Sequence, residues 1–163
     1  PHTHESNRLY RNRQGEKFED VTKEAGLDMV LATMGSNFGD FDNDGDVDIV
    51  INNMNDVPSL LRCDRKNSNH WIKVRLVGTR SNRSGIGARM KCVTGDLIQI
   101  DEVRSGGSYL SHNDLRIHFG LGAAESVDLL EVRWPSGQID SFRNLAVDRI
   151  VVAKEGARDL EGK

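Results

Sequence analysis

The sequence predicts an all-β fold, and three observations support this prediction. Apolar and polar residues alternate through most of the chain, as they do in strands with one buried face. Glycine clusters separate the alternating stretches, and no long helical pattern occurs. The 163 residues are 37% hydrophobic, which suffices for a core but is lean for one thick core. We therefore expect many short strands in thin layers.

The first third of the chain contains the one helical candidate and a faint repeat. Residues 21–25 predict a helix of a turn or two, which begins after Asp20 and ends at Gly26. Residues 9–12, Leu-Tyr-Arg-Asn, are echoed by residues 60–63, Leu-Leu-Arg-Cys. The echo comes about fifty residues later, a period within the range of propeller blades.

The second half predicts a series of half-buried strands. In residues 71–77 the apolar side chains of Ile72, Val74 and Leu76 share one face, and the basic side chains between them take the other face. Those basic residues are Lys73 and Arg75. The same alternation recurs in residues 89–93, 115–119 and 130–134.

A hairpin and a last strand complete this series. Residues 135–137, Pro-Ser-Gly, predict a tight turn. We expect Trp134 and Phe142 to flank the hairpin, with residues 139–142 in its returning strand. Residues 149–153 predict a final strand that is buried on both faces.

The acidic run at residues 40–48, Asp-Phe-Asp-Asn-Asp-Gly-Asp-Val-Asp, is the strongest chemical signal in the chain. Carboxylates at alternate positions repel one another unless a cation neutralises them. Hard cations such as Ca²⁺ take roughly six to eight oxygen ligands, and Gly45 permits the sharp turn that brings the ligands together. We expect side-chain ligands, a backbone carbonyl and water, the protein ligands being Asp40, Asp42, Asp44 and Asp48 through side chains and Asp46 through its carbonyl.

Other interpretations of the same run are weaker. An EF-hand would place a Glu at loop position twelve, where this chain has Ile51, and residues 48–51 predict a strand instead of a helix. An aspartate nucleophile for phosphoryl transfer would follow a buried apolar strand, and residues 32–37 are too small and polar for one. A solvated acidic turn without an ion stays the alternative.

Charge and composition exclude several classes of partner. With 29% charged residues and a net charge of -3, the chain has no general attraction to nucleic acid or to anionic membranes. No apolar run reaches the about 18 residues of a membrane span, and no signal peptide is recognisable. Because the chain begins at Pro1 without Met, we expect a fragment or a processed product.

The distribution of charge suggests a domain boundary. Residues 19–64 are acidic and the stretch that follows is basic, which places a boundary near Asp64. Two cysteines, Cys63 and Cys92, could form one disulfide in an oxidising compartment, but we expect free, partly buried thiols.

No catalytic constellation emerges from the sequence. The connection 104–114 contains Ser, His and Asp, but all three crowd one flexible loop, whereas a catalytic serine sits on a strained elbow with its base supplied from elsewhere. This loop is instead a candidate for ligand contact through Arg104, Ser108, Tyr109 and His112. Residues 85–89 predict a tight turn, and His118, Trp71 and Trp134 are expected to be structural or packing residues.

The first third resembles a known repeat. Its matching stretches are residues 7–12, 15–22, 25–27 and 38–46, which resemble an FG-GAP or VCBS repeat. Such repeats are blades of calcium-bearing β-propellers, so the resemblance implies that the five aspartates of residues 40–48 are calcium ligands. Because one repeat and the tail of another leave sheet faces and edges uncovered, we expect the second domain or another copy of the chain to cover them.

The second half resembles the ASPIC/UnbV domain, which follows such repeats in secreted acidic cartilage proteins and many bacterial surface proteins. The resemblance rests on residues 69–78, 81–89, 102–111, 118–122 and 132–137. We therefore expect a partial propeller-like repeat with a calcium loop at 1–64, a β-sandwich-like domain at 65–155 and a flexible tail at 156–163.

The resemblance also implies a function. It implies a non-enzymatic, calcium-binding adhesion or interaction module of an extracellular, cell-surface or periplasmic protein, with a protein or glycan ligand and a possible homo-oligomer through the incomplete repeat. The alternative is an accessory glycan-binding domain of a secreted hydrolase or carbohydrate-active protein. Neither interpretation includes nucleic-acid binding or membrane insertion.

Overall fold

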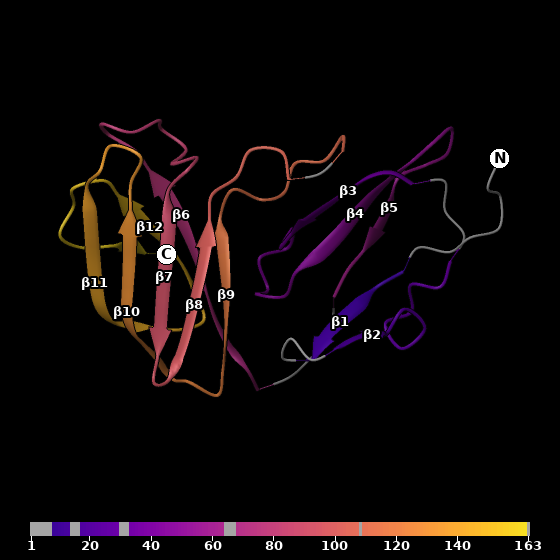
Figure 1. The fold of residues 1–163 in the computed structure, drawn as a ribbon, viewed down its shortest axis with the longest axis horizontal. Helices are drawn as coiled ribbons and strands as arrows, with labels where there is room; N and C mark the ends of the chain where they lie inside the picture. Colours follow the sequence, from indigo (N-terminus) through magenta and orange to yellow (C-terminus); the bar gives the residue numbers. More distant parts are fainter. Residues whose placement is uncertain (1–7, 14–16, 30–32, 64–67, 108, 163) are drawn as a thin grey trace.

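The fold is all-β, as the sequence predicts. The computed structural model describes residues 8–13, 17–29, 33–63, 68–107 and 109–162. Within these ranges the chain forms strands and no α-helix. Figure 1 shows a β-sandwich built from the later strands and, beside it, a smaller sheet and a hairpin built from the first five. In the part of the chain that the structure describes, no helix has the length and apolarity needed to cross a membrane.

The sandwich consists of two four-stranded sheets. One sheet has the order β11-β10-β7-β8, and the other has the order β13-β12-β6-β9. Neighbouring strands are antiparallel except β12 and β6, which run parallel. The strands are β6 (His70–Val77), β7 (Arg89–Thr94), β8 (Leu97–Glu102), β9 (Ile117–Gly122), β10 (Ser126–Arg133), β11 (Ile139–Ala146), β12 (Arg149–Lys154) and β13 (Glu161–Gly162).

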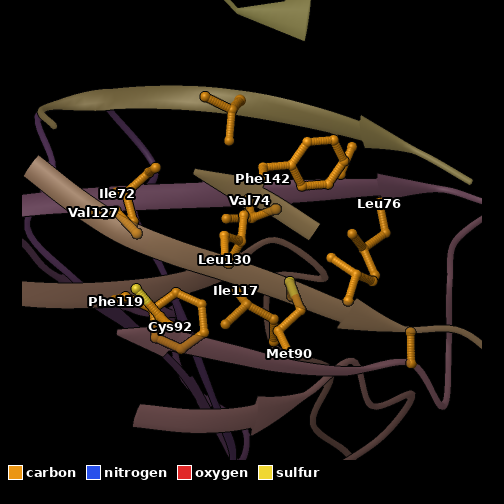
Figure 2. Close-up of a cluster of buried hydrophobic side chains, with 14 of the residues drawn as sticks. Ile72, Val74, Leu76, Met90, Cys92, Ile117, Phe119, Val127, Leu130 and Phe142 are labelled. Carbon is orange, nitrogen blue, oxygen red and sulfur yellow. The ribbon is translucent and has the colours of Figure 1, made fainter. Parts of the chain in front are cut away.

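The hydrophobic core lies between these two sheets (Figure 2). Ile72 and Val74 of β6 face Met90 of β7 and Leu130 of β10, and all four are fully buried. Each large aliphatic side chain buried in this way contributes roughly 1.5 to 3 kcal/mol relative to an exposed one. The alternation in the sequence therefore identifies the inward faces of β6, β7 and β10 correctly.

Two strands of the sandwich differ from expectation. β12 is not buried on both faces, because Val151 and Ala153 point into the core while Ile150 and Val152 stay partly exposed on the outer face. β8 was not predicted. It is an edge strand in which Ile98 and Ile100 are exposed, so burial imposes no alternating pattern on it.

The first third forms a hairpin and a three-stranded sheet. The hairpin pairs β1 (Tyr10–Arg13) with β2 (Lys17–Asp20), and the small sheet has the order β3-β4-β5. Its strands are β3 (Thr33–Gly39), β4 (Asp48–Asn53) and β5 (Ser59–Leu61). The strand after the acidic loop is thus confirmed as β4. The polar stretch before the loop is also a strand, held by its pairing with β4 more than by burial of apolar side chains.

The predicted helix at residues 21–25 is wrong. The segment forms a turn in which the amide of Ala25 donates to the carbonyl of Val21 at 2.9 Å. Asp20 accepts from the amide of Thr22 at 3.0 Å, and Gly26 ends the turn with φ 69°. Asp20 and Gly26 therefore do begin and end the turn, but the segment between them is too short to form a helix, because helix nucleation is unfavourable.

A loop of the sandwich covers one edge of the small sheet. The amide of Asp114 donates to the carbonyl of Phe38 at 3.0 Å, and the amide of Phe38 donates to Oδ1 of Asn113 at 3.0 Å. In Figure 1 the connection from β8 to β9 extends from the sandwich toward β3. A Cβ at Gly35 would lie 2.6 Å from the carbonyl oxygen of Leu110, so only glycine permits this approach. Packing against the second region is thus one way in which the incomplete repeat is covered.

The C-terminal residues return to the sandwich. Residues 156–163 are expected to be a flexible tail, but Glu161 and Gly162 pair with β12 as β13. Leu160 packs against the core. The chain is therefore attached to the sandwich through residue 162.

Glu155, the residue directly after β12, binds the loop that follows β6. Its Oε2 accepts from the backbone amides of Thr79, Arg80 and Ser81 at 2.8, 2.7 and 2.8 Å, and Oε1 accepts from the hydroxyl of Ser136. Burial alone would raise the pKa of Glu155, but these hydrogen bonds outweigh burial and lower the pKa to about 2. The ionised carboxylate therefore stabilises the fold.

We expect Glu155→Gln to destabilise the protein by about 1 to 3 kcal/mol at neutral pH. The folded pKa lies below the unfolded one, so the contribution of Glu155 is present above pH 4.5 and is lost as pH falls toward 2. Urea unfolding at several pH values should show a smaller loss of stability over this window in the variant than in the wild type. Glu125→Gln, at an exposed position, serves as the control. Equal pH profiles for Glu155→Gln and the wild type would contradict this role.

Candidate metal centre

The acidic loop connects β3 to β4 and is shaped by its own side chains. Asp48 is the first residue of β4, and its Oδ2 accepts from the amide of Phe41 at 2.9 Å. Oδ2 of Asp40 accepts from the amide of Gly45 at 3.2 Å, and Gly45 has φ 99°. A positive φ of this size favours glycine, which explains why the turn is placed at this residue.

Three of the predicted ligands converge. One carboxylate oxygen from each of Asp40, Asp42 and Asp48 lies within 4.8 Å of the other two. Asp40 and Asp48 are buried, whereas Asp42 is exposed. The chain therefore gathers three carboxylates, two of them withdrawn from water, at one place.

An unsatisfied oxygen shows that this cluster suits a cation. Among the described residues, Oδ1 of Asp40 is buried and has no hydrogen-bond partner. Leaving a buried carboxylate oxygen unpaired is costly, and a hard cation bound by the three carboxylates would remove this cost. Burial and then the charge of Asp44 raise the pKa of Asp46, which reflects the same crowding of negative charge. The donor set therefore fits Ca²⁺.

Asp44 and Asp46 lie outside the group of three. Oδ1 of Asp44 accepts from the amide of Asp46 at 2.9 Å, so this carboxylate shapes the loop. A side-chain ligand at Asp44 and a carbonyl ligand at Asp46 stay predictions.

The sandwich contributes a buried cation to the loop. Lys73 of β6 forms an ion pair with Oδ2 of Asp40, and its side chain is only 1% exposed. The expectation that Lys73 takes the polar face of its strand gives the correct face, but that face is covered by the acidic loop and not by solvent. Burial of this lysine is tolerated because its charge is paired with that of Asp40.

Trp71 and His118 form the floor beneath Gly45. The two rings are stacked with centroids 6.1 Å apart and an interplanar angle of 18°. Burial lowers the pKa of His118, so the ring is neutral at pH 7. Nε2 of His118 lies 2.8 Å from the carbonyl of Gly45, and since a carbonyl only accepts, Nε2 carries the proton. His118 is thus structural, as expected, and binds the loop.

Arg116 completes the contact. Its guanidinium donates to Oδ1 of Asn43 at 2.7 Å and to the carbonyl of Asp40 at 3.1 Å. Asp114 holds this guanidinium at 2.6 Å; burial would raise the pKa of Asp114, but the hydrogen bonds and charge of Arg116 lower it. The residues that position the acidic loop therefore come from two strands of the sandwich and the segment before β9.

None of these contacts between the sandwich and the acidic loop was predicted from the sequence. Lys73 and His118 are register partners on β6 and β9, so they share one outward face. Two polar residues at the same register of two strands are ordinary on a solvated face, and nothing in the pattern shows that another part of the chain covers them.

The candidate ligand loop is only partly assembled. Tyr109 is 72% exposed, and Arg104 and His112 are exposed as well, while Ser108 lies outside the described residues. The amide of His112 donates to Oδ1 of Asn37, so the loop is also part of the junction with the small sheet. A cavity of about 330 Å³ adjoins the loop, lined among others by Arg104, Asp101 and Glu102.

Both cysteines are free. Cys92 is buried in the core, and burial raises the pKa of its thiol to about 11, which makes it a poor nucleophile. Cys63 is partly buried, and its amide donates to Oδ1 of Asp48 at 2.9 Å. The expectation of free thiols is thus confirmed.

Comparison with known proteins agrees with both resemblances. Residues 78–160 match the family model described as ASPIC and UnbV, and residues 2–51 match the FG-GAP-like repeat. Human cartilage acidic protein 1 is 30% identical over 151 residues, which cover 86% of this chain. The mouse protein of the same name is 30% identical over 146 residues, which cover 83% of this chain. The chain spans 22% of the length of either relative.

Trp71 packs directly against Gly45 of the acidic loop. A Cβ at Gly45 would lie 2.0 Å from Nε1 of Trp71, so Gly45→Ala must displace the loop or the Trp71 ring. We expect a loss of about 3 kcal/mol or more in unfolding free energy, together with a shift of tryptophan emission as Trp71 becomes exposed.

Gly137→Ala is the matched control. Gly137 has φ 88°, close to the value at Gly45, but a Cβ there would meet nothing within 4 Å. This variant should cost only the backbone strain, about 1 kcal/mol, and should therefore lose less stability than Gly45→Ala. Equal losses in the two variants would show that Trp71 does not restrain the loop.

Proposed function

Because the chain belongs to the ASPIC and UnbV family and also contains an FG-GAP-like repeat, we propose that it is a non-enzymatic interaction module of an extracellular or cell-surface protein, stabilised by calcium. The observation that carries the calcium assignment is Oδ1 of Asp40 in the three-carboxylate cluster, which is buried and has no hydrogen-bond partner among the described residues. The relatives named for cartilage support an extracellular location.

Asp40, Asp42 and Asp48 are the proposed side-chain ligands, with Asp44 and Asp46 as further candidates. Bound calcium supplies positive charge to a loop that holds five carboxylates within nine residues, from 40 to 48. Side chains of the protein fix the position of the loop. Asp48 joins the loop to β4, and Arg116 and His118 hold it against the sandwich. The role of the ion is therefore structural.

Calcium should stabilise the protein. Binding to the folded state alone raises the unfolding free energy by about 2.7 kcal/mol when free calcium is a hundred times Kd, and extracellular sites commonly have Kd on the order of 0.1 to 1 mM. Thermal unfolding in calcium and in chelator should therefore give a higher Tm in calcium. Asp42→Asn should reduce this difference, since Asp42 is an exposed member of the cluster.

Asp96→Asn, in the exposed turn between β7 and β8, is the control and should respond to calcium as the wild type does. A Tm that is unchanged by millimolar calcium would refute the calcium assignment. It would leave the family assignment intact.

The loop from β8 to β9 supports a second candidate function, glycan contact. Exposed Tyr109 offers an aromatic face, and the adjoining cavity of about 330 Å³ presents Arg104 beside Asp101 and Glu102. An exposed aromatic face and charged hydrogen-bonding groups are both features that suit polar ligands with apolar patches, as sugars are.

A glycan array tests this second candidate. If the loop binds a glycan, Tyr109→Ala should lower binding at least about tenfold, the loss expected for one aromatic contact of roughly 1.4 kcal/mol. Tyr10→Ala, which removes an exposed tyrosine of the N-terminal hairpin, should have no effect. An array without signal for the wild type excludes this function in favour of a protein ligand.

A further inference from the structure

The acidic loop already has one cation, and this cation belongs to the chain. The ammonium of Lys73 contacts Oδ2 of Asp40, and the two side chains are 1% and 0% exposed. The two arginines that contact the loop in the described structure are placed differently. Arg62 lies 3.5 Å from Asp42 but is 56% exposed, so water and salt screen its charge. The charge of Arg116 is taken up by Asp114.

The carboxylate of Asp40 has two oxygens in different surroundings. Oδ2 accepts from Lys73 and from the amide of Gly45, whereas Oδ1 is buried and has no partner among the described residues. A metal ion bound by the cluster would therefore use Oδ1 while Lys73 keeps Oδ2. Two positive charges would then share one buried carboxylate.

We propose that Lys73 is a resident counter-ion that sets the calcium affinity of the loop. Without metal, the ammonium holds Asp40 in place and keeps the loop docked on the sandwich. With metal, it opposes binding, because it repels the second cation on the same carboxylate. This inference rests on the proposed calcium function and adds a regulator to it, namely a side chain of the ASPIC and UnbV region that tunes the site of the repeat.

The size of the change in calcium affinity follows from the short distance between the two cations. Charges that face the two oxygens of one carboxylate are only a few ångströms apart, and even in surroundings as polar as water a unit charge at about 4 Å changes the affinity for a divalent ion by at least about tenfold. Burial of Lys73 and Asp40 lowers the local dielectric and strengthens the repulsion. The site is thus suited to high calcium concentrations.

Replacing Lys73 with an uncharged side chain should move two measurements in opposite directions. In Lys73→Met, calcium should bind at least about tenfold more tightly, because the repulsion is gone. Without calcium, the same variant should have a lower Tm, because Asp40 loses its partner. The rise in Tm caused by calcium should therefore be larger than in the wild type. A lysine with a merely structural role would weaken calcium binding when removed, since the loop would be less well held.

Isothermal titration of the full chain with CaCl₂, together with melting curves in calcium and in chelator, measures both quantities. Arg75→Met is the matched control: Arg75 lies two residues along β6 on the same face, but it is exposed, unlike Lys73. It should leave Kd within about twofold of the wild type. Lys73→Gln removes the charge but keeps a donor for Asp40, and should also tighten binding.

The outcomes separate this inference from the proposed function. If the wild type binds calcium and neither Lys73 variant binds more tightly, the counter-ion role is overturned and the calcium function stands. If neither the wild type nor the Lys73 variants bind calcium, the counter-ion role and the calcium function are both overturned. If only the Lys73 variants bind, the counter-ion role is supported and the natural chain is not a calcium protein. Should both variants be unfolded without metal, refolding by calcium below the Kd of the wild type supports the role, and failure to refold overturns it.

Discussion

The burial of Asp40 is the constraint on which the junction depends. Its side chain is fully enclosed between the small sheet and the sandwich, so every charge and polar atom around it must be compensated. Lys73 supplies a charge to one oxygen, and the amide of Gly45 supplies a hydrogen bond to the same oxygen. The other oxygen has no partner among the described residues, and it is the atom that we propose a cation binds. Neutralising one carboxylate therefore joins a loop of the repeat to a strand of the sandwich.

Much of the sandwich could be predicted because burial imposes period two on its strands. The inward residues of β6, such as Ile72 and Val74, are visible in the sequence for this reason. β8 was not predicted, because an edge strand with exposed Ile98 and Ile100 has no such pattern. The turn at residues 21–25 shows the converse error, in which correct capping residues flank a segment too short to become a helix.

Of the candidate site, the acidic loop could be predicted from the sequence, but the residues of the sandwich that contact it could not. The spacing of carboxylates within a single loop indicates a cation, and three of the five aspartates do converge. The partner of Asp40 lies 33 residues away, on a strand whose alternation is as consistent with a solvated lysine as with a buried one. Periodicity identifies which side chains share a face, but it does not identify what covers that face. Lys73, Trp71 and His118 could therefore be assigned to a face and not to a function.

The distribution of apolar burial explains why a polar junction matters here. Before residue 64, the buried hydrophobic residues in the described part of the chain are Val21 and Ile51, whereas the core of the sandwich contains many. The small sheet therefore gains little from its own core and relies on hydrogen bonds to β3 and on the contacts of the acidic loop. Such contacts are geometrically specific but contribute modest net stability. The proposed cation, which would relieve the repulsion among the aspartates, would thus act where the repeat has the least apolar burial.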